Sequence, residues 1–152
     1  MNDQFQIIDA AEQPVLAVRT RTAVSTLPQI IGQAYAAIAA YMQELGETPK
    51  EAPYTAYFNM DMEDLDVEMG FPVPKAYPGK GDIKPGVIPA GKQATAMYKG
   101  AYEKMAPTYE AFTAWVAAQG YEPTGSSYEF YYNEPGKVSD DELLTKIMFP
   151  LK

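Results

Sequence analysis

An internal repeat constrains this chain more than any other feature. The block 31–59 aligns without a gap on the block 105–133, an offset of 74 residues. After four extra residues in the second copy, Phe71-Pro72-Val73 aligns on Phe149-Pro150-Leu151. This period exceeds that of solenoid repeats, so two copies predict a pair of modules with pseudo-twofold symmetry rather than an array. The identical pairs include Tyr35 with Tyr109, Gly46 with Gly120, Pro49 with Pro123, Tyr54 with Tyr128, Tyr57 with Tyr131, and Asn59 with Asn133.

Each copy has the pattern strand, helix, strand, strand. Short segments of alternating apolar residues indicate strands, and an apolar stripe at helical spacing, ended by a glycine, indicates the helix between them. The fold class is therefore predicted as α+β, with helices covering antiparallel sheets. We expect one domain, 1–152, in which repeats of about 4–73 and 90–152 are joined by a linker, 74–89, that holds four prolines and three glycines.

Composition excludes several kinds of chemistry. The 152 residues contain no histidine and no cysteine, which excludes Ser-His and Cys-His nucleophile pairs, His/Cys metal sites and disulfides. We therefore expect no metal and no cofactor. The net charge of −8 opposes a phosphate backbone, so direct binding of nucleic acid is not expected. The lack of a disulfide framework, of a signal peptide and of an apolar span predicts a cytoplasmic protein without membrane contact.

Two motifs come close to known ligand sites and fail. Gly86 to Lys92 matches the first seven positions of a P-loop, but Gln93 stands where serine or threonine would hold magnesium. The acidic run from Asp61 to Glu68 lacks the turn glycine of a calcium loop, and Leu65 occupies a ligand position. A solvated loop is the preferred interpretation of that run.

The informative positions are those where the two copies differ. Glu129 aligns with Thr55, and Glu68 aligns with Lys146. Strand alternation places Glu129 on one face with Tyr131, and Thr55 on one face with Tyr57. If those strands meet across the pseudo-twofold axis, aromatic rings surround one carboxylate, an environment that suits a cationic or polarised aromatic ligand. The alternative for Glu129 is a solvated sheet face on which it pairs with a lysine, and the alternative for Glu68 is that it simply continues the acidic loop beside it.

Two further aromatic residues are candidates for a binding site. Tyr102 precedes the second helix, and Trp115 lies off its apolar stripe of Met105, Tyr109, Phe112 and Val116. Trp115 either packs on the other module or lines a cleft. Tyr109 is interpreted as a core residue.

The ordered motifs resemble a known family. The second copy carries Pro89-Ala90-Gly91-Lys92, Gly100-Ala101-Tyr102, Trp115, Tyr128-Glu129-x-Tyr131 and Phe149-Pro150-Leu151, and the first copy carries Val67 to Val73. Over residues 4–152 this is similar to the GyrI-like small-molecule-binding domain, the fold of the effector-binding region in multidrug-responsive activators of the MerR and AraC types.

The resemblance implies a fold and a site. It implies two strand–helix–strand–strand modules and planar, hydrophobic, often cationic ligands held in a groove between the modules, against an acidic residue that maps onto Glu129. The aromatic lining maps onto Tyr57, Tyr131, Tyr102 and Trp115, and Glu68 is a further candidate. The family's activators carry a helix-turn-helix region for which this chain has no room, so a standalone member is expected.

Three functions remain open. The first is sensing or sequestration of an amphipathic small molecule, aromatic or cationic. The second is hydrolysis of strained, cyclopropanoid-type toxins, with Glu68, Glu129 and Tyr131 as candidates for acid–base chemistry. The third is a protein–protein inhibitor of the gyrase-inhibitor type, in which the acidic surface binds a basic protein partner.

Overall fold

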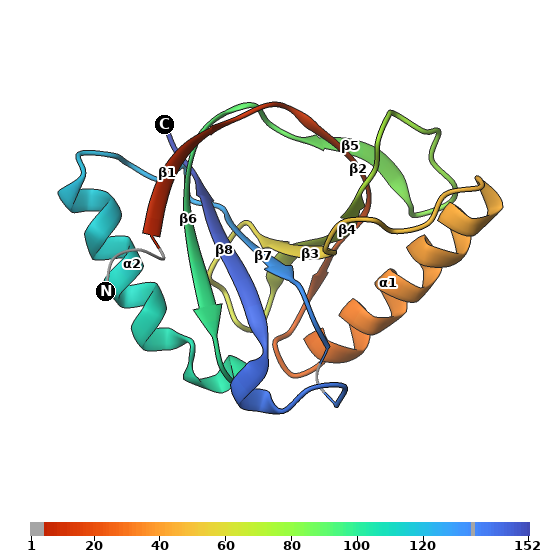
Figure 1. Ribbon diagram of the computed structural model, residues 1–152. Coiled ribbons are helices and arrows are strands. Elements are labelled where there is room, and N and C mark those ends of the chain that lie inside the picture. Colours follow the sequence, from red (N-terminus) through yellow and green to blue (C-terminus); the bar gives the residue numbers. More distant parts are fainter. Residues whose placement is uncertain (1–4, 135) are drawn as a thin grey trace. The chain divides into compact units, whose positions relative to one another are not determined.

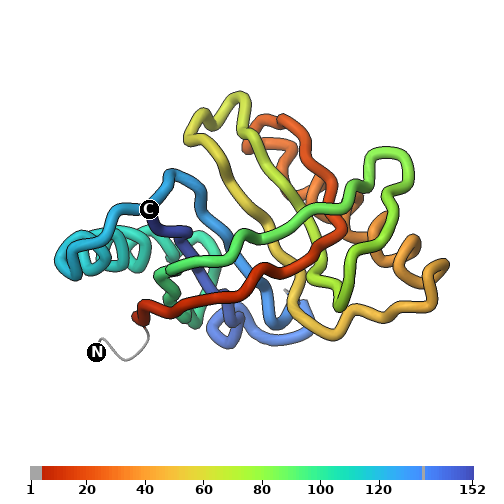
Figure 2. Tube along the Cα trace, turned by 90° about the horizontal axis from the view of Figure 1, so that it is seen from above, coloured from red at the N-terminus to blue at the C-terminus, as the bar shows by residue number. Residues whose placement is uncertain are grey.

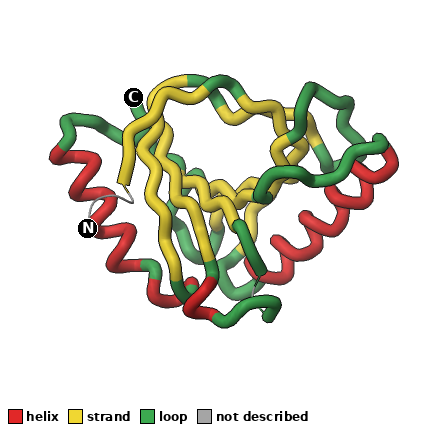
Figure 3. The backbone as a smooth tube through the Cα atoms, in the orientation of Figure 1, coloured by secondary structure: helices red, strands yellow, loops and turns green. Residues whose placement is uncertain are grey.

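The protein is described by a computed structural model that covers residues 5–134 and 136–152, and it divides into two compact units (Figure 1). Unit 1 combines the N-terminal segment up to Ala10 with Gly91–Lys152, and unit 2 consists of Ala11–Ala90. Both units join an antiparallel sheet to one long helix, as the secondary-structure colouring shows (Figure 3). The predicted α+β class is confirmed.

Unit 2 contains four strands in the order β3-β4-β2-β5 and the helix α1. Every neighbouring pair is antiparallel. One face of the sheet packs against α1. Leu16 and Phe71 of the sheet cluster with Ile38 and Met42 of the helix. Met69 lies in the adjoining cluster with Ala34 of the helix. The elements are β2 (Gln13–Thr22), α1 (Leu27–Glu44), β3 (Tyr54–Tyr57), β4 (Leu65–Pro72) and β5 (Lys84–Ile88).

Unit 1 repeats this plan with four strands in the order β1-β6-β8-β7 and the helix α2. These pairs are also antiparallel. Phe112 and Val116 of α2 are fully buried against Ala96, Ile147 and Phe149 of the sheet. The elements are β1 (Phe5–Ala10), β6 (Gly91–Lys99), the short 3-10 helix η1 (Tyr102–Lys104), α2 (Ala106–Ala118), β7 (Ser127–Tyr131), the short 3-10 helix η2 (Asp140–Glu142) and β8 (Leu144–Pro150).

Each unit takes its outer strand from outside its own repeat. β1 precedes β2 directly in the chain but pairs with β6, beside which it runs in Figure 2. The stretch 74–89, expected to be a linker, instead contributes β5, which pairs with β2. The prolines of that stretch suggested a linker, but an edge strand tolerates Pro85 because one of its sides needs no hydrogen-bond partner.

An asparagine that is identical in both repeats closes the loops β3–β4 and β7–β8. Each side chain accepts a hydrogen bond from one backbone N–H near the start of the following strand and donates one to a loop carbonyl. The bonds are Asp66 N to Asn59 Oδ1 at 2.9 Å, Asn59 Nδ2 to Asp64 O at 3.0 Å, Leu144 N to Asn133 Oδ1 at 2.9 Å, and Asn133 Nδ2 to Glu142 O at 3.0 Å.

Replacing either asparagine with alanine should destabilise the fold. Asn59→Ala and Asn133→Ala each remove two hydrogen bonds worth about 1 kcal/mol apiece, so we expect about 1–2 kcal/mol less free energy of unfolding. Chemical denaturation measures this loss, with the exposed Gln33→Ala on α1 as the control. Unchanged stability in both asparagine variants would show that the loops do not depend on these bonds.

Candidate functional site

The candidate site lies on the face of the unit 1 sheet that α2 covers. Glu129 on β7 stands directly across from Ile147 on β8, and Ile147 is part of the core beneath α2. Because side chains alternate along a strand, Ser127 and Tyr131 project on the same side as Glu129. The carboxylate is therefore partly buried beside an apolar core.

Two tyrosines hold the Glu129 carboxylate, one at each oxygen. The Tyr109 hydroxyl, from α2, donates to Oε2, and the Tyr131 hydroxyl donates to Oε1 at 2.9 Å. The Tyr109 hydroxyl also lies 3.2 Å from Ser127 Oγ. No lysine or arginine among residues 5–134 and 136–152 forms an ion pair with Glu129. The negative charge thus has hydrogen-bond donors but no counter-charge.

This environment changes the acidity of the carboxyl group. Burial raises the pKa of Glu129 above its ordinary value, and the hydrogen bonds from Tyr109 and Tyr131 only partly offset that rise. Burial disfavours the charged form of an acid, whereas donors to the carboxylate favour it. The carboxyl group of Glu129 therefore loses its proton less readily than that of an exposed glutamate.

Tyr102 lies beside Tyr131, one of the two tyrosines that hold Glu129. Its ring is 5.7 Å from that of Tyr131, tilted by 58°. Burial raises the pKa of Tyr102, and the charges of Glu129 and Glu134 raise it further. With 37% of its surface exposed, Tyr102 presents an aromatic surface to solvent beside Tyr131.

Unit 2 repeats the same arrangement without the charge. The Tyr35 hydroxyl, from α1, lies 2.9 Å from Oγ1 of Thr55, the residue that aligns with Glu129. Tyr57, predicted as a site residue, lies on β3 and packs against the core beside α1. The helix-to-strand hydrogen bond is thus common to both units, and the carboxylate is particular to unit 1.

Glu68, the second predicted acid, lies in a different setting. It is on β4 of unit 2, between Val67 and Met69, which both face the α1 core, so Glu68 points to the opposite face of the sheet. Its Oε2 accepts a hydrogen bond of 2.7 Å from the Tyr54 hydroxyl. The structure thus places Glu68 and Glu129 in separate units. Glu129 is on the helix-covered face of its sheet, whereas Glu68 is on the face that the helix does not cover.

Trp115 belongs to the packing of unit 1. Its ring is 5.7 Å from that of Phe5 on β1, and it packs against the core cluster beneath α2. Tyr109, interpreted from the sequence as a core residue, also packs on Phe149 but sends its hydroxyl to Glu129. The signal that could have revealed this contact is the repeat itself, which aligns Tyr109 with Tyr35 as well as Glu129 with Thr55.

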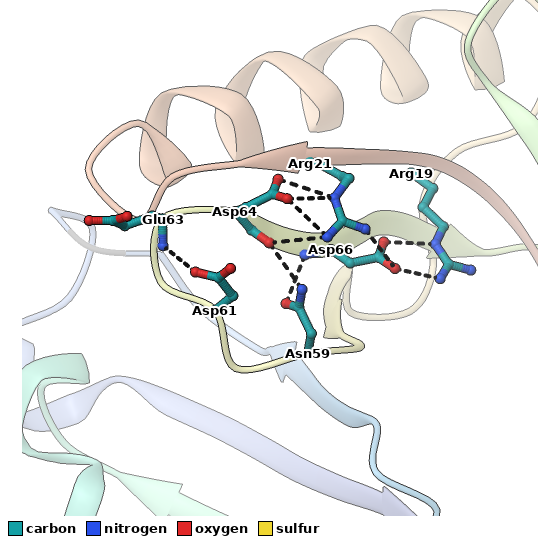
Figure 4. Close-up of polar contacts among 7 residues, drawn as sticks. All are labelled: Arg19, Arg21, Asn59, Asp61, Glu63, Asp64 and Asp66. Atoms are coloured by element: carbon teal, nitrogen blue, oxygen red, sulfur yellow. Dashed lines mark hydrogen bonds and ion pairs between the residues drawn. The ribbon is translucent and has the colours of Figure 1, made fainter.

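Two carboxylates of the acidic run of unit 2, those of Asp64 and Asp66, are paired with arginine (Figure 4). Arg19 binds Asp66 through two hydrogen bonds of 2.8 and 3.0 Å, and Arg21 binds Asp64. The hydrogen bond from Arg19 holds the pKa of Asp66 below its ordinary value. Within the described ranges, no three acidic side chains gather as a group that could hold a metal ion.

Comparison with known families decides the chain's relationship. The GyrI-like small molecule binding domain matches residues 3–152. The chain belongs to this family. It is thus a small-molecule-binding domain, and the predicted family is confirmed. Among the described residues, no helix has the length and apolar character needed to cross a membrane.

Solved structures show the same fold. The C-terminal domain of EcmrR is 25% identical, with a TM-score of 0.75 over 98% of this chain and 97% of that one. EcmrR in its complex with DNA gives a TM-score of 0.78 at 25% identity, and there this chain spans 57% of the EcmrR chain. A search of curated proteins gave no match.

Two more distant structures share the fold alone. A hydrolase from Listeria innocua is 14% identical, with a TM-score of 0.73 over 98% of this chain and 92% of that one. SAV2435, solved with tetraphenylphosphonium bound, is 11% identical, with a TM-score of 0.67 over 97% of this chain and 93% of that one.

The raised pKa of Glu129 predicts how stability changes with pH. Below the ordinary glutamate pKa of about 4.3, folded and unfolded chains both carry this proton. As the pH rises towards the folded-state pKa, only the folded chain keeps it, so the contribution of Glu129 to stability falls. We therefore expect the free energy of unfolding of the wild type, minus that of Glu129→Gln, to decrease from pH 4 to pH 7.

Chemical denaturation across that pH range measures the difference. Glu122→Gln is the matched control, because it removes one negative charge of unit 1 at an exposed ion pair with Lys152. A difference that stays constant or grows with pH would contradict a raised pKa at Glu129.

Proposed function

We propose that this protein binds hydrophobic organic cations at Glu129, for sensing or sequestration. The observation that carries the proposal is a partly buried carboxylate held by two tyrosines with no cationic side chain to neutralise it. By contrast, Asp9, Glu44 and Asp66 all have a lysine or arginine partner. A buried charge without a counter-charge is costly, and a cationic ligand relieves that cost.

The aromatic groups beside Glu129 fit the same ligand class. The rings of Tyr102 and Tyr131 offer π faces to a cation, each worth roughly 0.5–2 kcal/mol. The net charge of −8 adds a long-range attraction for cations. Tetraphenylphosphonium, the compound bound in the SAV2435 structure, is both hydrophobic and cationic, and is therefore the probe of choice.

A second candidate function is hydrolysis of strained electrophiles. The pairing of Tyr109 with Glu129 favours it, because a carboxyl group with a raised pKa next to a phenol can exchange a proton with a substrate. The two candidates differ in outcome, since a binding protein returns its ligand unchanged and a hydrolase releases a product.

Calorimetric titration with tetraphenylphosphonium tests the first candidate. We expect saturable binding by the wild type and at least about tenfold weaker binding by Glu129→Gln, since a tenfold change corresponds to 1.4 kcal/mol, less than the roughly 4 kcal/mol of a close charge pair in a partly solvated site. Glu122→Gln is the control and should bind like the wild type. Glu68→Gln tests the other predicted acid, and we expect it to bind normally.

Three results would count against this function. They are absence of binding by the wild type, equal binding by Glu129→Gln, and chemical conversion of strained-ring electrophiles by the wild type. The last, followed by chromatography and lost in Glu129→Gln, would favour the hydrolase.

A further inference from the structure

Thr145, on β8 of unit 1, has an unusual buried hydroxyl group. The residue is fully buried, with 0% of its surface exposed. Its Oγ1 has no hydrogen-bond partner among the residues that the structure describes. A buried polar group without a partner is destabilising, and such groups are rare in native proteins. The position of this hydroxyl therefore needs an explanation.

Strand register places Thr145 beside the Glu129 site. Thr145 stands directly across from Tyr131 on β7 and from Tyr98 on β6, and two residues further along β7 and β8 Glu129 pairs with Ile147. Thr145 is thus the diagonal neighbour of Glu129 on the helix-covered face. Diagonal neighbours lie about 7–8 Å apart, within the span of one small organic molecule.

The internal repeat shows that the fold does not require this hydroxyl. With the offset that aligns Glu68 on Lys146, Thr145 aligns with Val67. Val67 is also fully buried, in the apolar cluster beside α1. Valine and threonine have nearly the same shape, so the same position accepts an apolar side chain in unit 2 and carries an unsatisfied hydroxyl in unit 1.

Two departures from the repeat therefore meet at one place. Glu129 stands where unit 2 has Thr55, and Thr145 stands where unit 2 has Val67. Both residues make the same patch of one sheet face more polar. We propose that Thr145 is a ligand-binding residue whose hydroxyl makes a hydrogen bond to an oxygen-bearing group of the cation held by Glu129. This inference rests on the function proposed above and narrows its ligand class to cations that carry a hydroxyl or carbonyl group.

Tyr102 packs against the residue that stands directly across from Thr145. That residue is Tyr131, and Tyr102 itself belongs to the three-residue helix η1 rather than to the sheet.

A matched pair of cations tests the proposal. Tetraphenylphosphonium has no hydrogen-bonding group, and its derivative with a hydroxymethyl group on one ring has one. We expect the hydroxylated cation to bind the wild type about threefold to tenfold more tightly than the parent, as for one added hydrogen bond. In Thr145→Val this advantage should vanish, while the affinity for tetraphenylphosphonium stays unchanged.

Thermal unfolding without ligand provides the second readout. Thr145→Val should melt above the wild type, because it removes an unsatisfied hydroxyl at constant shape. Thr55→Val is the matched control: it is also fully buried, but its hydroxyl is bonded to Tyr35, so it should melt below the wild type and keep the preference for the hydroxylated cation.

Each outcome separates this inference from the proposed function. Equal affinity of the wild type for both cations, an advantage that survives in Thr145→Val, or a melting temperature of Thr145→Val at or below the wild type overturns the role of Thr145 alone. Failure of the wild type to bind either cation overturns the cation site as a whole, and the role of Thr145 with it.

Discussion

The candidate site of unit 1 depends on two hydroxyl groups that hold one carboxylate. Tyr109 from α2 and Tyr131 from β7 each donate to a different oxygen of Glu129. Without these donors a carboxylate at the margin of an apolar core would bear the full cost of desolvation. With them it is fixed in orientation, while its charge is left uncompensated. The same bond from Tyr109 also joins the helix to the last strand in the sheet order of its unit.

Comparison of the two repeats shows which part of this arrangement belongs to the scaffold. Tyr35 reaches Thr55 from α1 as Tyr109 reaches Glu129 from α2, so the bond between helix and strand does not depend on the charge. Exchange of one strand residue then converts a neutral structural contact into an anionic one. A duplicated fold can acquire a site in this way, because the uncharged copy continues to support its own helix.

Local patterns in the sequence predicted the α+β class, the family and the pairing of Glu129 with Tyr131 on one strand face. The exchange of outer strands was not predictable, because the choice of β6 as the partner of β1 is set by pairing between residues far apart in the chain. The hydrogen bond from the Tyr109 hydroxyl to Glu129 was not predicted either. Helical spacing identifies which side chains face the core, but not where a hydroxyl group at the end of such a side chain binds. Thr145 gave no signal, because threonine is an ordinary residue in strands.

The polar groups of unit 1 have opposite consequences for stability and for binding. A carboxyl group with a raised pKa and a buried hydroxyl without a partner each weaken the ligand-free fold. Unit 2 shows that the same scaffold accepts Thr55 and Val67 at these positions without either burden. A ligand of the proposed class, with a positive charge and a hydrogen-bonding group, would supply what both positions lack. Because such a ligand would bind the folded chain, it would also stabilise that chain, and the cost in the free protein would become affinity in the complex.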